Sequence, residues 1–171
     1  LSCLLKMHGL EIFDAYLAEV HGGQMIAFIS HSGAREKTGR LTKLFEKEAA
    51  SGCNTIQAYQ NFSGRLNDLK NQNVKFLQNK KKEGKTVYGL GAPVKGNTLL
   101  NYFDVGTETI DCLVEKNALR KGLYSPGMHI PVVFEDDLTA FPDVYYVLAW
   151  NFKKEILERY KSQIDAGVEF Y

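Results

Sequence analysis

The chain has little of what marks secreted, disulfide-bonded or membrane-spanning proteins. Its 171 residues include three cysteines, four prolines and one tryptophan. No apolar run approaches the ~20 residues that cross a bilayer, and no charged segment with a small-residue cleavage site marks a signal peptide. Cys3, Cys53 and Cys112 are odd in number and widely separated, without a CxxC pair, which excludes a disulfide framework and a zinc knuckle. These absences predict a cytoplasmic protein without a membrane partner.

Charge of one sign is not in excess either. The 21 Lys and Arg residues against 20 Asp and Glu leave a net charge of +1, which argues against nucleic-acid binding. A hydrophobic content of 44% is enough to build a core in one domain, or one domain plus part of another. The chain begins Leu1-Ser2-Cys3, without an initiator Met, in an apparent helix end that Gly9 would cap. We therefore expect a fragment of a longer protein.

The segment Thr86–Tyr102, TVYGLGAPVKGNTLLNY, carries the most information. Apolar and β-branched residues lead into a Gly-rich turn and then an amphipathic segment, the pattern of a nucleotide-binding βαβ unit. Gly89 and Gly91 would let backbone amides approach a ligand, and the helix N-terminus behind them favours an anion. Val94 replaces the third Gly of a dinucleotide fingerprint, and Lys95-Gly96 reverses the order of a P-loop. The turn is Rossmann-like without the usual NAD or ATP signature.

The remaining pattern predicts alternating strands and helices. Two strands within Leu10–Ile29, joined through His21-Gly22-Gly23, predict a hairpin, and a long helix with an apolar stripe runs to about Lys82. The other predicted elements are a short helix ending near Gly52, strands at 86–90, 110–114, 130–134, 144–149 and 168–171, and helices at 94–103 and 152–164. The fold class is α/β: a Rossmann-like, mostly parallel sheet flanked by helices, preceded by a β-hairpin and a long helix.

Ligands bind such sheets beyond the carboxyl ends of the strands. This rule brings Gly89–Lys95, Glu115–Asn117 and Trp150–Asn151 together, whatever family the chain belongs to.

Four segments, taken in order, resemble the C-terminal part of the sugar C-methyltransferases. They are HGLEIFDAYLAEVHGG, GLGAPVKGNTLLNYF, EKNALRKGLYSPGMHIPV and VLAWNFKKEI. That family uses S-adenosylmethionine to methylate carbon 3 of nucleotide-linked 4-keto deoxysugars. The resemblance implies that residues 1–30 are the tail of a central methyltransferase domain, 31–39 a linker and 40–171 a C-terminal Rossmann-like domain. It also implies that the S-adenosylmethionine loop, a Tyr-x-Glu-His acid/base segment and a zinc-binding domain lie upstream. The fragment alone would then be inactive and bind no cofactor.

The chain departs from the family pattern at two places. The family usually has Asp-x-Asn-Pro-x-Lys where Glu115–Arg120 stands here, and Ser where Gln24 stands. Charge is kept at both ends of the first motif, but its Pro turn is lost. These differences concern the identity of the substrate more than the fold.

His21 is the first catalytic candidate. A strand-end histidine beside two glycines can bind a sugar hydroxyl or remove a proton alpha to a ketone, since its pKa lies near neutrality. Glu19 points to the same strand face and could orient it. The alternative is a histidine that only shapes the hairpin turn.

The substrate-binding candidates surround the Gly-rich turn and the loop after the next strand. They are Gly89, Gly91, Ala92, Lys95, Asn97, Glu115, Asn117 and Arg120. Lys95 and Asn97 would contact a diphosphate. Two alternatives remain open, close helix–strand packing at the glycines and a plain surface turn at 115–120. No metal site is expected.

The expected partners are a nucleotide-sugar, dTDP-linked, and the rest of the same polypeptide. The fragment would hold the nucleotide-sugar and close the active-site cleft. The alternative is a non-catalytic nucleotide or nucleotide-sugar binding module, or a structural lid.

Overall fold

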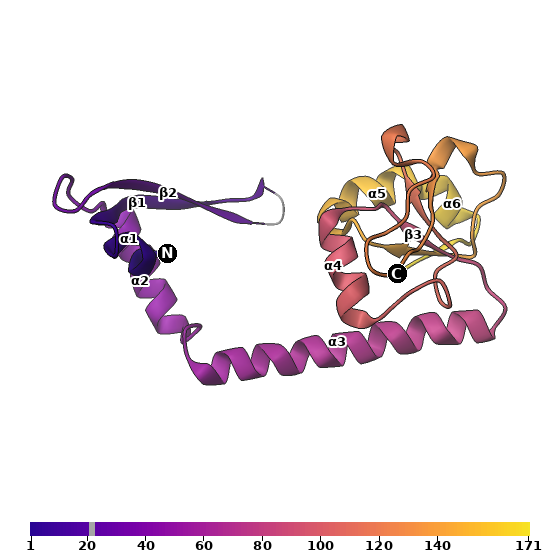
Figure 1. The fold of residues 1–171 in the computed structure, drawn as a ribbon, viewed down its shortest axis with the longest axis horizontal. Coiled ribbons are helices and arrows are strands. Elements are labelled where there is room, and N and C mark those ends of the chain that lie inside the picture. Colours follow the sequence, from indigo (N-terminus) through magenta and orange to yellow (C-terminus); the bar gives the residue numbers. More distant parts are fainter. Residues whose placement is uncertain (21–22) are drawn as a thin grey trace. The chain divides into compact units, whose positions relative to one another are not determined.

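The computed structural model describes residues 1–20 and 23–171. They form two compact units, Leu1–Gly64 and Arg65–Tyr171 (Figure 1). The long helix α3 (Ile56–Lys82) contains the boundary between the units.

The first unit is a β-hairpin packed against two helices. Its elements are α1 (Ser2–Lys6), β1 (Leu10–Ala18), β2 (Gln24–His31) and α2 (Gly39–Ser51). The strands are antiparallel and pair Leu10 with His31 and Ala18 with Gln24, which confirms the predicted hairpin. Its core consists of Leu5, Ile12, Ala15 and Leu41. The predicted turn falls largely at positions 21–22, outside the described residues.

Asp14 and Thr38 connect this hairpin to the start of α2. The Thr38 hydroxyl accepts a hydrogen bond from the Leu41 amide at 3.2 Å, as an N-cap does. It also donates to Asp14 at 2.6 Å. Arg40 pairs with the same carboxylate, and these bonds lower the pKa of Asp14. At the other end of α2, Gly52 takes the left-handed conformation, with φ of 63°.

The second unit alternates strands and helices. Its elements after α3 are β3 (Val87–Leu90), α4 (Val94–Phe103), β4 (Cys112–Glu115), β5 (Val132–Phe134), β6 (Val144–Val147), α5 (Lys153–Arg159), α6 (Lys161–Asp165) and β7 (Glu169–Phe170). Short 3₁₀ helices occupy Ala118–Arg120, Glu135–Asp137 and Trp150–Phe152.

The strands of this unit form one parallel sheet. Within the described residues the order is β5-β4-β3-β6-β7, and every pairing is parallel. The chain moves outward from β3 to β5, then returns to the other side of β3 with β6. The strand order therefore reverses between β3 and β6, which creates the switch point where ligands bind in doubly wound folds.

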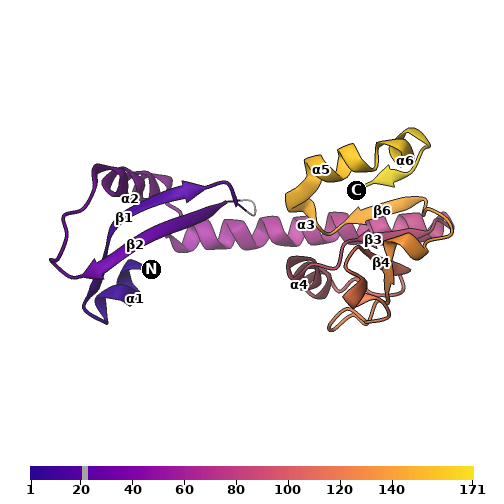
Figure 2. The ribbon, with the colours of Figure 1, turned by 90° about the horizontal axis from the view of Figure 1, so that it is seen from above.

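Helices cover both faces of the sheet (Figure 2). On one face, Leu77 of α3 and Leu100 and Phe103 of α4 pack against the strands. On the other, Ile156 of α5 and the buried Tyr160 pack against the sheet. The α/β, Rossmann-like fold class predicted from the sequence is confirmed.

The predicted helix at 152–164 is wrong in one respect, because it is two helices. Tyr160, between α5 and α6, has φ of −94° and ψ of 17°, and is 3% exposed. Its ring packs 5.7 Å from those of Tyr145 and Phe170, and its hydroxyl donates to Glu135. These tertiary contacts fix Tyr160 at a bend that the helical periodicity does not reveal.

The apolar stripe predicted along α3 is buried only near its carboxyl end. Leu77 is fully buried within the sheet core. Ile56, Tyr59 and Phe62 are exposed within the described structure. The stripe thus contributes to the core of the second unit through its last turns.

Candidate functional site

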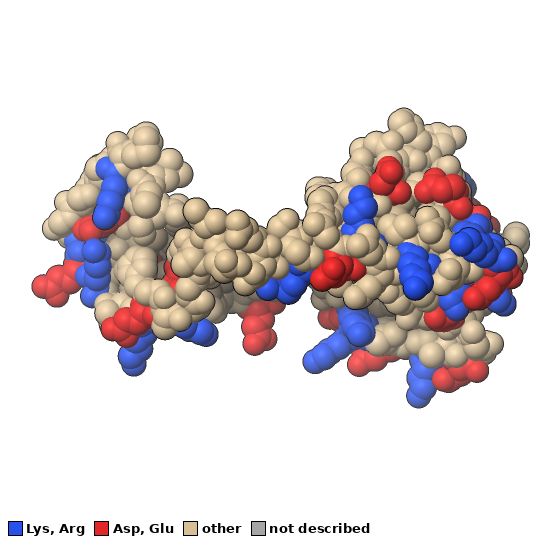
Figure 3. All heavy atoms as spheres, turned by 90° about the horizontal axis from the view of Figure 1, so that it is seen from below, with Lys and Arg blue, Asp and Glu red and all other residues tan. Residues whose placement is uncertain are grey.

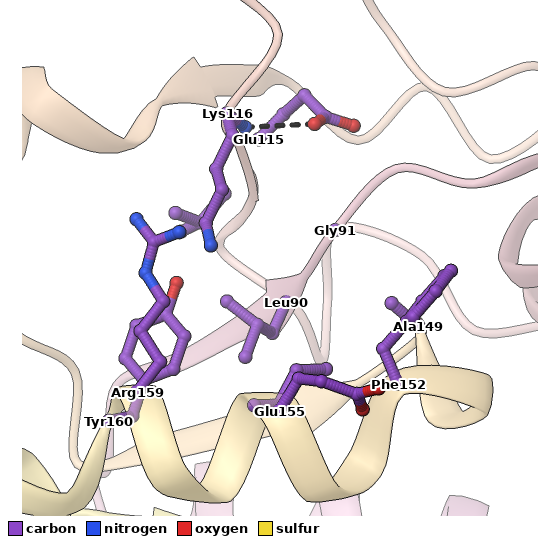
Figure 4. A pocket seen from close by; sticks show the side chains of 11 residues that line it. Leu90, Gly91, Glu115, Lys116, Ala149, Phe152, Glu155, Arg159 and Tyr160 are labelled. Carbon is purple, nitrogen blue, oxygen red and sulfur yellow. Dashed lines mark hydrogen bonds between the residues drawn. The ribbon is translucent and has the colours of Figure 1, made fainter.

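A crevice of about 470 Å³ lies beyond the carboxyl ends of β3, β4 and β6, at the switch point of the sheet (Figure 4). Its lining comes from Leu90 and Gly91 at the end of β3, Val114, Glu115 and Lys116 at the end of β4, Ala149 and Phe152 after β6, and Glu155, Ile156, Arg159 and Tyr160 around α5. Two of the three segments expected to converge, Gly89–Lys95 and Glu115–Asn117, contribute to the crevice, whereas Trp150 and Asn151 of the third do not line it.

The floor and one wall of the crevice are apolar. Leu90 and Val114 are buried in the sheet, and Ile156 and Tyr160 belong to the same apolar cluster. Burial and the hydrogen bond to Glu135 raise the pKa of Tyr160. The Tyr160 phenol therefore stays neutral and is held by its bond to Glu135. The result is a fixed surface against which a flat, partly apolar group can pack.

Charged side chains lie at two sides of this apolar surface. Figure 4 shows Lys116 and Arg159 on the same side, above Tyr160. The Glu155 carboxylate points toward Phe152, away from both cations (Figure 4). The crevice thus has a cationic side and an anionic side.

The Glu115 carboxylate makes four hydrogen bonds around the Gly-rich turn. It accepts from the backbone amides of Ala92 at 3.2 Å, Lys116 at 2.8 Å and Asn117 at 3.1 Å. Arg120 donates to it at 2.9 Å and also to the Ala92 carbonyl at 2.7 Å. One backbone amide of the Gly-rich turn, that of Ala92, therefore has a carboxylate of the chain itself as partner.

Glycine is required at positions 89 and 91 for two different physical reasons. A Cβ at Gly89 would lie 2.5 Å from Leu113 Cδ2 and 3.1 Å from Leu148 Cδ1, so close packing alone accounts for this residue. Gly91 has φ of 86°, a conformation that side chains rarely adopt, and it lines the crevice. The Gly91 amide donates to the Val114 carbonyl at 2.7 Å.

Other predicted binding residues lie around a second, smaller cavity. Ala92, Asn97 and Arg120 line this space of about 250 Å³. The Asn97 Oδ1 atom is buried and, within the described residues, accepts no hydrogen bond. Lys95 is an exposed residue of α4 that lines neither cavity. Asn117 caps a 3₁₀ helix by accepting from the Leu119 amide at 3.1 Å. The predicted set is thus divided between two neighbouring cavities and their surroundings.

The catalytic candidates belong to the other unit. His21 lies outside the described residues. Glu19 is exposed and follows the last residue of β1. Their catalytic roles stay predictions.

Sequence reasoning missed the wall of the crevice that α5 provides. The sequence predicted a helix at 152–164 but assigned none of its residues to a site. Lys116 lay inside the predicted converging segment but was not a candidate. The signal was available, since a helix that starts just after a strand's carboxyl end lines the ligand crevice in this fold.

Fold and crevice together define the class: a doubly wound α/β domain with a crevice at its switch point. The model of the C-methyltransferase C-terminal domain family matches residues 19–171, so the chain belongs to this family. The chain is 30% identical over 172 residues to the C-methyltransferase NovU of Streptomyces niveus. That alignment covers 99% of this chain and 41% of NovU, so the chain spans about two fifths of its relative.

The described residues contain neither a cluster of metal ligands nor a membrane-spanning helix. In residues 1–20 and 23–171, no three His, Cys, Asp or Glu side chains are grouped to hold a metal ion. No helix among them is both long and apolar enough to cross a bilayer. On the face drawn in Figure 3, Lys and Arg are interspersed with Asp and Glu.

Proposed function

We propose that this chain is the C-terminal part of an S-adenosylmethionine-dependent enzyme that methylates a carbon of a nucleotide-linked keto-deoxysugar. Residues 1–30 would complete the central methyltransferase domain, 31–39 would link it, and 40–171 would bind the nucleotide-sugar and close the cleft. The observation that carries this proposal is the crevice of about 470 Å³ at the sheet's switch point in a member of this family. Its volume is within the ~300–1,000 Å³ typical of small-molecule sites.

The reaction begins at the carbon next to the sugar ketone. A base removes a proton there, and the electron pair of the broken C–H bond forms an enolate. S-adenosylmethionine, when bound, would supply the electrophilic methyl group: as the enolate carbon forms the new C–C bond, the methyl–sulfur bond would break and leave S-adenosylhomocysteine as a neutral thioether. Alignment of the substrate and stabilisation of the enolate oxygen would supply the rate enhancement. We propose His21, oriented by Glu19, as a candidate for contacting the sugar or moving this proton.

The crevice suits a nucleotide better than S-adenosylmethionine. Glu115 is the last residue of β4. Both of its carboxylate oxygens already accept two hydrogen bonds each and are not available to a ribose. Lys116 and Arg159 would repel a sulfonium cation. We therefore assign S-adenosylmethionine and zinc to segments outside this chain.

Titration of the chain with thymidine 5′-diphosphate tests this role. We expect heat of binding from the unmodified chain and none from Ile156→Trp, because the larger side chain would fill the crevice. Leu157→Trp is the matched control, since Leu157 lines a different cavity of about 220 Å³. Equal binding by all three proteins would contradict the assignment to this crevice.

A structural lid is the second candidate, and specific contacts favour it. Glu115 accepts a hydrogen bond from the Ala92 amide of the Gly-rich turn, and Gly89 is explained by packing alone. If the folded chain gives no heat with thymidine 5′-diphosphate, the lid replaces the binding role.

A further inference from the structure

We propose that Lys116 and Arg159 form an anion clamp that holds the diphosphate of the nucleotide in the crevice. This inference rests on the proposed function and specifies where the charged part of the ligand binds. It differs from the sequence-based expectation, in which amides of the Gly-rich turn, Lys95 and Asn97 held the phosphates.

The part of the turn around Ala92 is a poor phosphate site because the Glu115 carboxylate already accepts a hydrogen bond from the Ala92 amide. The same carboxylate accepts hydrogen bonds from the amides of Ala92, Lys116 and Asn117, and Arg120 neutralises its charge. The Glu115 side chain is only 15% exposed. A phosphate would have to displace a partly buried carboxylate and take over four hydrogen bonds. Phosphates are therefore better placed at another cationic group of the crevice.

Lys116 and Arg159 provide that group. The Lys116 ammonium lies 5.7 Å from the centre of the Tyr160 ring, and the Arg159 guanidinium carbon lies 5.7 Å from the same centre. Figure 4 shows the two side chains converging on one side of the crevice. Two like charges on the same side of one crevice repel each other, and a doubly charged anion bound between them would reduce that cost.

Only one of the two cations has a carboxylate partner. Arg159 donates to Glu135 Oε2 at 3.0 Å, while Tyr160 donates to the other oxygen of the same carboxylate. Glu135 thus fixes the guanidinium and leaves other N–H groups for a ligand. Within the part of the chain that the structure describes, Lys116 has the Tyr160 ring as its partner and no carboxylate within ion-pair distance. Its charge is available to a ligand.

The opposite side of the crevice sets the direction of the ligand. The Glu155 carboxylate points toward Phe152 and would repel a phosphate there. An N–H group of a base or a ribose hydroxyl can instead donate to it, with the base against Phe152. The diphosphate would thus lie at the clamp, the ribose over the apolar floor and the base next to Glu155.

The test compares Lys116→Ala with Lys154→Ala. Both residues are exposed lysines, but Lys154 is on the first turns of α5 and does not line the crevice. Calorimetric titration with thymidine 5′-diphosphate should give about tenfold weaker binding for Lys116→Ala, equivalent to the loss of one charge-assisted contact. Lys154→Ala should bind like the unmodified chain. Thymidine, followed by ligand-observed NMR, should bind both variants equally because it lacks phosphates.

The outcomes separate the clamp from the proposed function. If thymidine 5′-diphosphate binds Lys116→Ala and Lys154→Ala equally well, the clamp is wrong and nucleotide binding stands. If Lys116→Ala weakens thymidine and thymidine 5′-diphosphate by the same factor, the lysine contacts the nucleoside and the clamp is again wrong. If the unmodified chain binds no thymidine 5′-diphosphate, both proposals fall. Arg159→Gln, checked for native folding because Arg159 also pairs with Glu135, should weaken binding in the same way as Lys116→Ala.

Discussion

At the residue scale, Glu115 is the side chain that binds the Ala92 amide of the Gly-rich turn. Its carboxylate accepts hydrogen bonds from three backbone N–H groups and a guanidinium. These hydrogen bonds are stronger than those that an uncharged side chain would accept. The carboxylate connects the end of β4 to the start of α4 and to the 3₁₀ helix that contains Arg120. One residue thus holds the loops on one side of the crevice.

Glu115→Gln should destabilise the second unit. The amide keeps the shape of the carboxylate but loses its charge and offers an N–H where an acceptor is needed. We expect a loss of about 1–3 kcal/mol in the free energy of unfolding. Urea unfolding followed by the fluorescence of Trp150, the single tryptophan, measures it.

Glu158→Gln, an exposed change on α5, is the control and should leave the urea midpoint unchanged. Equal midpoints for Glu115→Gln and Glu158→Gln would show that the bonds of Glu115 contribute no net stability.

At the element scale, the starts of β3 and β6 are joined by Asp143. Its carboxylate accepts from the Thr86 amide at 2.9 Å, the Thr86 hydroxyl at 2.9 Å and Lys85 at 3.0 Å. In return the Asp143 amide donates to the Thr86 hydroxyl at 2.8 Å. These bonds hold the amino ends of the two strands that flank the switch point, opposite the crevice.

Stability should depend on the ionisation of Asp143 at acid pH. Hydrogen bonding to the Thr86 backbone, followed by Lys85 and the Thr86 hydroxyl, lowers its pKa from 3.8 to about 2. Because the folded-state pKa is the lower one, the contribution is complete above the unfolded pKa and is lost as the pH falls toward the folded one. Asp143→Asn should therefore lower the urea midpoint at pH 6, and its difference from the unmodified chain should shrink between about pH 4 and pH 2.

Asp136→Asn provides the matched comparison. Asp136 belongs to the 3₁₀ helix Glu135–Asp137, in which it is Asp137 that pairs with Lys121. This variant should follow the unmodified chain at every pH. An Asp143→Asn deficit that persists unchanged down to pH 2 would contradict the argument.

At the scale of the whole molecule, each unit has its own core. The apolar cluster of the first unit consists of residues between Leu5 and Leu44. The two clusters of the second unit consist of residues between Val74 and Phe170. No described cluster includes residues of both units, so each core should be able to form without the other.

A shortened chain of residues 65–171 should fold by itself. We expect its urea midpoint, followed by Trp150 fluorescence, to lie close to that of the full chain, because all clusters around the sheet are retained. Scanning calorimetry of the full chain should show a separate transition for the first unit. A shortened chain without a cooperative transition would show that the first unit is needed for the second to fold.

The fold was predictable because its signals are local. Val94–Phe103 was predicted as a helix with the bounds that the structure has, and the strand around Gly89 followed from its apolar residues and the Gly-rich turn. The parallel direction of the strands also follows from the alternation of strands and helices, but the strand order β5-β4-β3-β6-β7 was not predicted. The bend at Tyr160 was not predictable, because it results from contacts with residues distant in sequence.

The candidate site was predictable in place more than in detail. The strand ends meet where the fold rule puts them. The rule does not say whether a turn amide will face a ligand or a side chain of the chain itself, as it does at Glu115. Nor does helical periodicity separate a residue that packs in the core from one such as Phe152, which is exposed and lines a crevice.

The crevice has a consequence for how this domain can diversify. Four of its charged and aromatic lining residues, Lys116, Phe152, Glu155 and Arg159, are solvent-exposed, whereas the strands beneath them are held by buried clusters. Exchanges at these four positions change charge and shape without opening voids in the interior. The rim of the crevice can therefore vary in charge and shape while the buried clusters beneath it stay the same.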